Sequence, residues 1–72
     1  MEHWYIIINK GITTSDVVTL AGMLGMHNLR YTNNYVQIWL TTDSQIGKLC
    51  QMLNILEVDF ILAKDYNLDE QY

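Results

Sequence analysis

The stretch "LRYTNNYVQIWL", residues 29–40, constrains the fold more than any other part of the chain. Two strand-like runs flank Asn33-Asn34, and asparagine tolerates the positive φ that a two-residue type I′ turn requires. We therefore predict a β-hairpin that pairs Arg30 with Gln37, and alternation then defines its two faces. One face carries Leu29, Tyr31, Val36, Ile38 and Leu40, and the other carries Arg30, Thr32, Tyr35, Gln37 and Trp39.

A strand and a helix are expected on each side of this hairpin. Before it, residues 3–9 are β-branched and aromatic, which indicates a buried strand, and residues 13–25 have the period of an amphipathic helix. After it, residues 41–54 begin with a capping-box spacing and continue as a helix, and residues 55–64 alternate like a strand. The apolar stripes of the two helices are Val17, Leu20, Ala21 and Leu24, and Ile46, Leu49, Cys50 and Leu53.

The resulting order, β-α-β-β-α-β, predicts a compact ferredoxin-like α+β sandwich, a four-stranded antiparallel sheet with two helices on one face. Residues 1–65 would form this single domain, and residues 66–72 a polar, acidic C-terminal tail that frays at its end. The helix-covered face of the sheet is expected to carry Trp4, Ile6, Ile8, Val36, Ile38, Leu40, Val58 and Phe60.

Large apolar and aromatic side chains are expected on the opposite face, which no helix would cover. A contiguous exposed patch of this kind is typical of an interaction site, and tyrosine and tryptophan are enriched in protein interfaces. A strand phase shifted by one residue would instead bury the tyrosines, so that alternative stays open. The candidate partner-binding residues are Tyr5, Ile7, Tyr35, Trp39 and Ile61.

The net charge of −4 narrows the range of partners. Only four residues are basic, so the chain lacks the lysines and arginines that bind nucleic-acid backbones. A protein partner is therefore expected, either a second copy or a host protein, and nucleic acid is disfavoured. A homodimer is the expectation, because a domain of 72 residues buries only about 60% of its unfolded surface and needs further stabilisation.

The single cysteine, Cys50, excludes a disulfide within the chain and fits a reducing cytoplasm. The N-terminal "MEH" lacks the basic region and apolar run of a leader, and no window is long and apolar enough to span a membrane. The isoleucine, asparagine and tyrosine content and the absence of proline are typical of low-GC bacteria or their phages.

No pattern of catalytic or metal-binding residues is visible. Cys50 lies on a helix stripe, where a buried, inert thiol is expected. His3 and His27 have no carboxylate or cysteine beside them, and one cysteine with two distant histidines does not make a zinc site. We therefore expect no enzymatic activity, no metal and no cofactor.

The loop "NKGITTSD", residues 9–16, could hold a ligand or only join the first strand to the first helix. Thr13 and Asp16 have capping-box spacing, and that carboxylate occupies the place where a helix N-terminus would attract an anion. "NKGI" followed by "LGMHNL" is similar to the ligand loop and helix exit of ACT domains, although the proline and the first aspartate of that pattern are missing. The resemblance implies ligand contact at Asn9, Gly11 and Ile12.

Our interpretation is a small, cytoplasmic, non-enzymatic protein that acts by protein–protein contact, plausibly as a bacterial or phage accessory, regulatory or inhibitor protein. The alternative is an ACT-like domain that senses a small ligand with its first loop. Binding of single-stranded RNA to the aromatic face is a weaker alternative, because a chain with a pI of about 4.7 repels phosphate.

Overall fold

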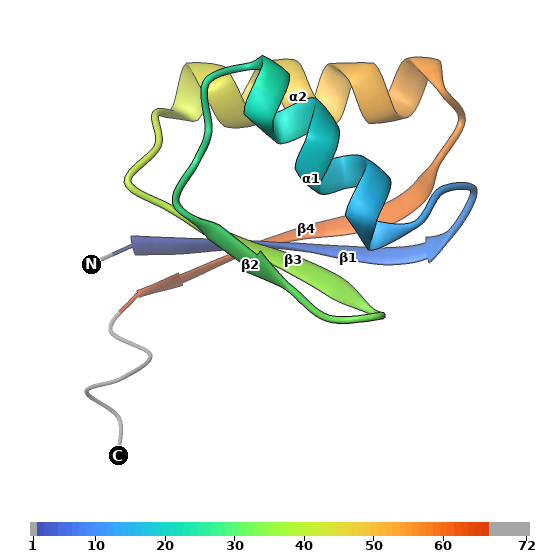
Figure 1. Cartoon of the computed structure of the whole chain (residues 1–72), viewed down its shortest axis with the longest axis horizontal. Helices are drawn as coiled ribbons and strands as arrows, with labels where there is room; N and C mark the ends of the chain where they lie inside the picture. The colour runs from blue at the N-terminus through green and yellow to red at the C-terminus, as the bar shows by residue number, and fades with distance from the viewer. Residues whose placement is uncertain (1, 67–72) are drawn as a thin grey trace.

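Over the residues that the structure describes, the chain is an α+β protein with four antiparallel strands in one open sheet and two helices. The structure, a computed structural model, describes residues 2–66 and the side chains of residues 3–64. Both helices lie on the same side of the sheet, whose strand order is β2-β3-β1-β4 (Figure 1). The elements are β1 (Glu2–Lys10), α1 (Thr14–Met23), β2 (Leu29–Tyr31), β3 (Tyr35–Trp39), α2 (Asp43–Ile55) and β4 (Asp59–Tyr66). Of the expected tail, Tyr66 is the last residue of β4, and residues 67–72 lie outside the described part of the chain.

The β2–β3 hairpin has the register expected from the sequence, with Arg30 opposite Gln37. Its turn has a different backbone, because Asn33 and Asn34 are not among the described residues with positive φ. The type I′ prediction is therefore wrong. The Thr32 hydroxyl explains the difference, since it accepts hydrogen bonds from the amides of Asn34 at 3.1 Å and Tyr35 at 3.3 Å. A threonine that bonds the amides two and three residues ahead stabilises a turn without left-handed residues.

The core lies between the sheet and the helices, and it is built from the predicted faces. Each fully buried valine, leucine or isoleucine side chain contributes about 1.5–3 kcal/mol to the free energy of folding. Met26, which the helix stripes did not include, is also buried, because it follows the tight end of α1. The buried apolar residues are Ile6, Val17, Ala21, Met26, Val36, Ile38, Ile46, Leu49, Leu53 and Val58. Trp4, Ile8 and Phe60 are partly buried and pack against them, as do Leu20, Leu24 and Cys50.

Leu40 does not belong to this core, so its expected place on the helix-covered face is wrong. It follows the last residue of β3, has φ 54°, and is 67% exposed. The left-handed backbone ends the alternation of the strand before Leu40 can reach the core.

The last strand begins at Asp59, four residues after the start expected from its alternation at residues 55–64. Helix α2 continues to Ile55, and Glu57 then adopts φ 59°. The amides of Glu57 and Val58 donate to the carbonyls of Asn54 and Leu53, both at 3.0 Å, which is a Schellman motif. This helix end holds four residues that the sequence pattern assigned to the strand, and it leaves Leu56 exposed.

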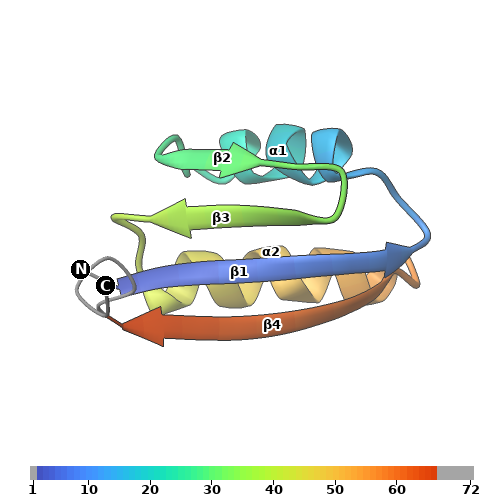
Figure 2. The ribbon, with the colours of Figure 1, turned by 90° about the horizontal axis from the view of Figure 1, so that it is seen from below.

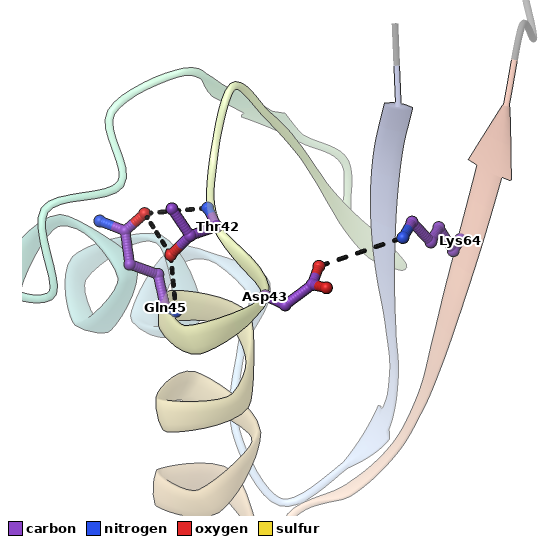
Figure 3. Close-up of polar contacts among 4 residues, drawn as sticks. All are labelled: Thr42, Asp43, Gln45 and Lys64. Atoms are coloured by element: carbon purple, nitrogen blue, oxygen red, sulfur yellow. Dashed lines mark hydrogen bonds and ion pairs between the residues drawn. The ribbon is translucent and has the colours of Figure 1, made fainter.

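Both helices begin at the predicted capping residues. Thr13 Oγ1 accepts from the amide of Asp16 at 3.2 Å, and Thr42 forms a complete capping box with Gln45 (Figure 3). The side-chain nitrogen of Gln45, Nε2, also donates a hydrogen bond to the carbonyl of Leu24 at 3.2 Å. One side chain therefore joins the start of α2 to the end of α1.

Lys64 connects β4 to the start of α2 on the helix-covered side. Its Nζ lies 4.5 Å from the centre of the Trp4 ring. The same atom lies 4.0 Å from Oδ1 of Asp43, as Figure 3 shows. Because the Asp43 side chain is 84% exposed, the ion pair contributes little, and the contact with the Trp4 ring is the stronger restraint.

Candidate protein-interaction surface

The open face of the sheet is the side opposite the helices. Figure 2 shows it directly, with the four strands toward the viewer and both helices behind them. No described helix covers it. The open face consists of His3, Tyr5 and Ile7 on β1, Arg30 on β2, Tyr35, Gln37 and Trp39 on β3, and Ile61 and Ala63 on β4.

The five predicted partner-binding residues share this face. Tyr5 and Ile7 lie on β1, between Tyr35 and Trp39 on β3 and Ile61 on β4. Ile7 is directly opposite Tyr35 on one side and Ile61 on the other. The strand phase is the expected one, because the intervening residues, such as Ile6 and Val36, point into the core. Tyr5, Ile7, Tyr35 and Trp39 are partly buried, and Ile61 is exposed.

One end of the open face is a row of stacked groups around Trp39. Its direct neighbour on β1 is His3, whose ring is 5.8 Å from the Trp39 ring at an interplanar angle of 20°. Arg30 on β2 places its Cζ 5.5 Å from the centre of the same ring. Trp39 therefore contacts one neighbour on each adjacent strand, which fixes the orientation of a large amphipathic side chain.

The middle of the open face is an edge-to-face pair of tyrosines. The rings of Tyr5 and Tyr35 are 5.7 Å apart at 60°, which is the geometry that aromatic quadrupoles favour. The two residues are diagonal in the register, since Tyr5 is opposite Gln37 and Tyr35 is opposite Ile7. Aromatic side chains are long enough to bridge such a diagonal.

Gln37 joins the two aromatic groups. It is only 7% exposed, although it lies on the face that no described helix covers. Its Nε2 donates to the hydroxyl of Tyr5 at 3.2 Å and contacts Nδ1 of His3. Because an amide nitrogen can only donate, Nδ1 of His3 is the acceptor. The open face thus has a fixed polar link beneath its aromatic rings, and the rings themselves shield that link from water.

His3, Arg30, Gln37 and Ala63 are the members of the open face that the candidate list lacked. Strand alternation could have identified His3, since it has the same parity as Tyr5, and the hairpin register had already placed Arg30 and Gln37 beside Trp39. No pattern in the sequence indicates that a glutamine here would be buried by its aromatic neighbours.

Between the end of β1 and the start of α1, the three residues considered for ligand contact help to form the turn. Asn9 is exposed, at a register shift between Ile8 and Lys10 in the pairing with β4. Gly11 has φ +107°, and a Cβ there would lie 3.1 Å from Cα of Val58. Ile12 packs against the core. These three residues therefore have structural roles in a turn that passes close to the chain entering β4.

Other kinds of site find no support in the part of the chain that the structure describes. Residues 3–64 contain no group of three or more histidine, cysteine or acidic side chains that could hold a metal ion, and no pocket opens among them. Burial raises the pKa of the Cys50 thiol, which makes it a poorer nucleophile at neutral pH. No described helix is long and apolar enough to cross a membrane.

Comparison with known proteins gives no further guide to function. No family model, no curated protein and no solved structure matches this chain.

Proposed function

We propose that this protein acts without catalysis, by binding another protein through the open face of its sheet. One observation carries the proposal: Tyr5, Tyr35 and Trp39 lie together on a face that no described element covers. Exposed aromatic clusters on a rigid sheet are characteristic of interfaces, because the rings bury a large area and lose little side-chain entropy on binding.

The composition of the open face supports a protein partner. Its centre is aromatic and aliphatic and carries no charge, whereas Arg30 lies at its margin, on the edge strand β2. Protein interfaces have this arrangement, a core without charges surrounded by a polar rim. His3, Arg30 and Gln37 hold the rings in place, so little further ordering is needed when a partner binds.

We infer further that the fold is the ferredoxin-like arrangement. The support is the chain order β-α-β-β-α-β together with the strand order β2-β3-β1-β4, antiparallel neighbours and two helices on one side. In that arrangement β1 and β3 are the central strands, and they carry most of the open face. A reducing compartment such as the cytoplasm suits the free thiol of Cys50.

Single-stranded RNA is a weaker candidate for the same face. Aromatic residues on the two central strands could stack with bases. However, the net charge is −4, and Arg30 is the only arginine or lysine on the open face, where it already packs on Trp39. Phosphate binding would therefore lack the cations that supply most of its affinity.

Matched variants test the proposal. The wild type, Trp39→Ala and Tyr35→Ala would be used as baits to capture binding proteins from a bacterial lysate. Bacteria are chosen because the amino-acid composition is typical of low-GC bacteria or their phages. Met23→Ala and Ile55→Ala are controls, since these apolar residues of the helices are 74% and 78% exposed. We expect proteins retained by the wild type and both controls to be lost from both open-face variants.

Calorimetric titration with the purified captured protein would then measure the affinity directly. A loss of at least tenfold in Trp39→Ala, with both controls unchanged, supports the open face. Equal affinity in all variants would overturn the proposal. Binding of a single-stranded RNA oligonucleotide that Trp39→Ala abolishes would also overturn it, in favour of RNA recognition.

A further inference from the structure

The two edges of the described sheet are very different. Strand β2 has three residues with Arg30 in the middle, which is a short and charged edge. Strand β4 has eight residues and is paired only with β1 (Figure 2). A long edge strand presents a row of N–H and C=O groups to which another strand can bond, and proteins usually protect it with charges or shorten it.

The hydrogen bonds of the sheet show which groups of β4 point outward. The amide of Ile8 donates to the carbonyl of Asn34, on the β3 side of β1, at 2.9 Å. Because bonding alternates along an antiparallel strand, Ile7 and Tyr5 bond toward β4, where their partners are Ile61 and Ala63. Phe60 and Leu62 therefore direct their N–H and C=O groups away from β1, toward the outer edge.

The side chains along this outer edge are apolar. Ile61 on the open face is 53% exposed, and Leu62 on the opposite face is 39% exposed. The charged residues Asp59 and Lys64 flank this segment and do not interrupt it. An edge strand with exposed aliphatic groups on both of its faces is suited to pairing with another strand.

We propose that a second copy of this chain pairs antiparallel with β4, with the two-fold axis at Ile61. In this register Ile61 lies opposite Ile61 of the second copy, Phe60 lies opposite Leu62, and Asp59 lies opposite Ala63. The outward N–H and C=O groups of Phe60 and Leu62 then bond to each other, which satisfies the edge. No charge faces a like charge, and the central pairs are apolar.

Neighbouring registers that keep the two open faces on one side are less favourable. An axis at Leu62 places Phe60 opposite Lys64 of the second copy, so a charged side chain faces a large apolar one. An axis at Ala63 likewise places Leu62 opposite Lys64. The strand is therefore self-complementary about Ile61, and this selects a second copy as the occupant.

The pairing would join two four-stranded sheets into one continuous sheet of eight strands, with all helices on one side. The Ile61 side chains meet on the open face, beside Ile7 of each copy. If the proposed function holds, both open faces then form one surface with two-fold symmetry. The dimer itself does not depend on that function, since Trp39 lies on β3, two strands away from β4.

A cysteine pair tests the register. In a Cys50→Ala background, Ile61→Cys places two thiols at a non-hydrogen-bonded pair, where Cα atoms are about 4.5 Å apart and a disulfide can form. In the matched control, Ala63→Cys, the Cα atoms of the two copies are about 14 Å apart. Mild oxidation should give a covalent dimer with Ile61→Cys and none with Ala63→Cys. Cross-linking of Ala63→Cys alone, or of neither variant, would overturn the proposed pairing.

Light scattering tests the dimer without cross-linking. We expect the wild type to have twice the monomer mass of 8.4 kDa, and Leu62→Pro to have the monomer mass. Proline removes an N–H that points outward, so the β1–β4 ladder and the circular dichroism spectrum should be preserved. A monomeric wild type would overturn the dimer. Trp39→Ala should keep the dimer mass, so failure of the open-face proposal and failure of the β4 proposal give different results.

Discussion

The side chain of Gln37 donates a hydrogen bond to the hydroxyl of Tyr5 at 3.2 Å, on the face of the sheet opposite the helices. A buried amide is unusual on such a face, because water would normally satisfy it. Here the amide lies beneath the aromatic side chains of the open face, so the bond orders those rings before any partner arrives. Stability of the folded protein and preorganisation of the proposed interface therefore depend on the same residue.

Gln37→Leu should lower the free energy of unfolding by about 1 kcal/mol. The leucine has a similar size but removes the hydrogen bonds from Gln37 to Tyr5 and His3, and both of these side chains can bond to water because they are only partly buried. Urea denaturation followed by circular dichroism measures the change. Gln51→Leu, at an exposed position of α2, is the control and should change the free energy by less than about 0.5 kcal/mol. Equal effects of the two variants would show that the Gln37 bonds contribute nothing.

The ends of the two helices provide a second test. Both close with a Schellman motif, in which the left-handed residue is Gly25 after α1 and Glu57 after α2. A residue with a Cβ is strained in this conformation and glycine is not. Glu57→Gly should therefore raise the free energy of unfolding by about 1 kcal/mol, measured by urea denaturation.

Two variants control for other effects at these positions. Glu57→Ala removes the charge but keeps the Cβ, so it should gain much less stability than Glu57→Gly. Gly25→Ala should lower the free energy of unfolding by at least about 1 kcal/mol. Its φ of +87° strains a residue with a Cβ, and the new Cβ would lie 3.3 Å from Nε2 of Gln45. A gain in Glu57→Ala as large as that in Glu57→Gly would show that backbone strain is not the cause.

The sequence predicts those parts of the fold that depend on local chemistry. The caps at Thr13 and Thr42 form as expected, because a threonine side chain three residues before a free amide satisfies it in almost any context. The register of the hairpin follows from two strands joined by two residues. The side chains of the open face follow from that register together with strict alternation in β1.

Two of the failures occur where a non-glycine residue adopts a left-handed backbone. Leu40 and Glu57 both do so, and no feature of the sequence marks them, since glycine or asparagine is the usual residue there. The alternation in residues 55–64 was misleading at its start, because Glu57 ends the helix there with a left-handed backbone. A helix end can carry apolar residues two positions apart, as a strand does. The burial of Gln37 depends on side chains of its own strand β3 and of the adjacent strands β1 and β2 together, so the sequence pattern alone does not predict it.

The glycines of the first loop and first helix should respond oppositely to alanine. Gly11→Ala should lower the free energy of unfolding by at least about 1 kcal/mol, because φ is +107° and the new Cβ would approach Cα of Val58. Gly22→Ala should raise it by about 1 kcal/mol, since it lies inside α1 and an added Cβ has no neighbour within 4 Å. Thermal denaturation of both variants measures the contrast.

This pair of variants also bears on the ligand-sensing alternative. If Gly11 serves only the turn, a screen of amino acids should raise the midpoint of thermal unfolding in neither the wild type nor Gly22→Ala. A ligand that stabilises both of these proteins but not Gly11→Ala would instead support binding at the first loop.

Cys50 should react slowly in the folded protein. Burial raises the pKa of its thiol above the ordinary 9.0, so little thiolate is present at pH 8. Iodoacetamide should therefore label the native protein at least several-fold more slowly than the urea-unfolded protein, as measured by mass spectrometry. Equal labelling rates in the two states would contradict protection of this partly buried thiol by the fold.

The same raised pKa predicts a pH dependence of stability. Below pH 9.0 the thiol is protonated in both states, and its full contribution is present. As the pH rises from 9.0 through the higher pKa of the folded state, the unfolded chain releases the proton first, so the free energy of unfolding falls. Cys50→Ala lacks this group and serves as the control, because the two proteins differ only at this side chain. Urea denaturation between pH 7 and 10.5 should show a steeper decline for the wild type, and parallel declines would contradict the prediction.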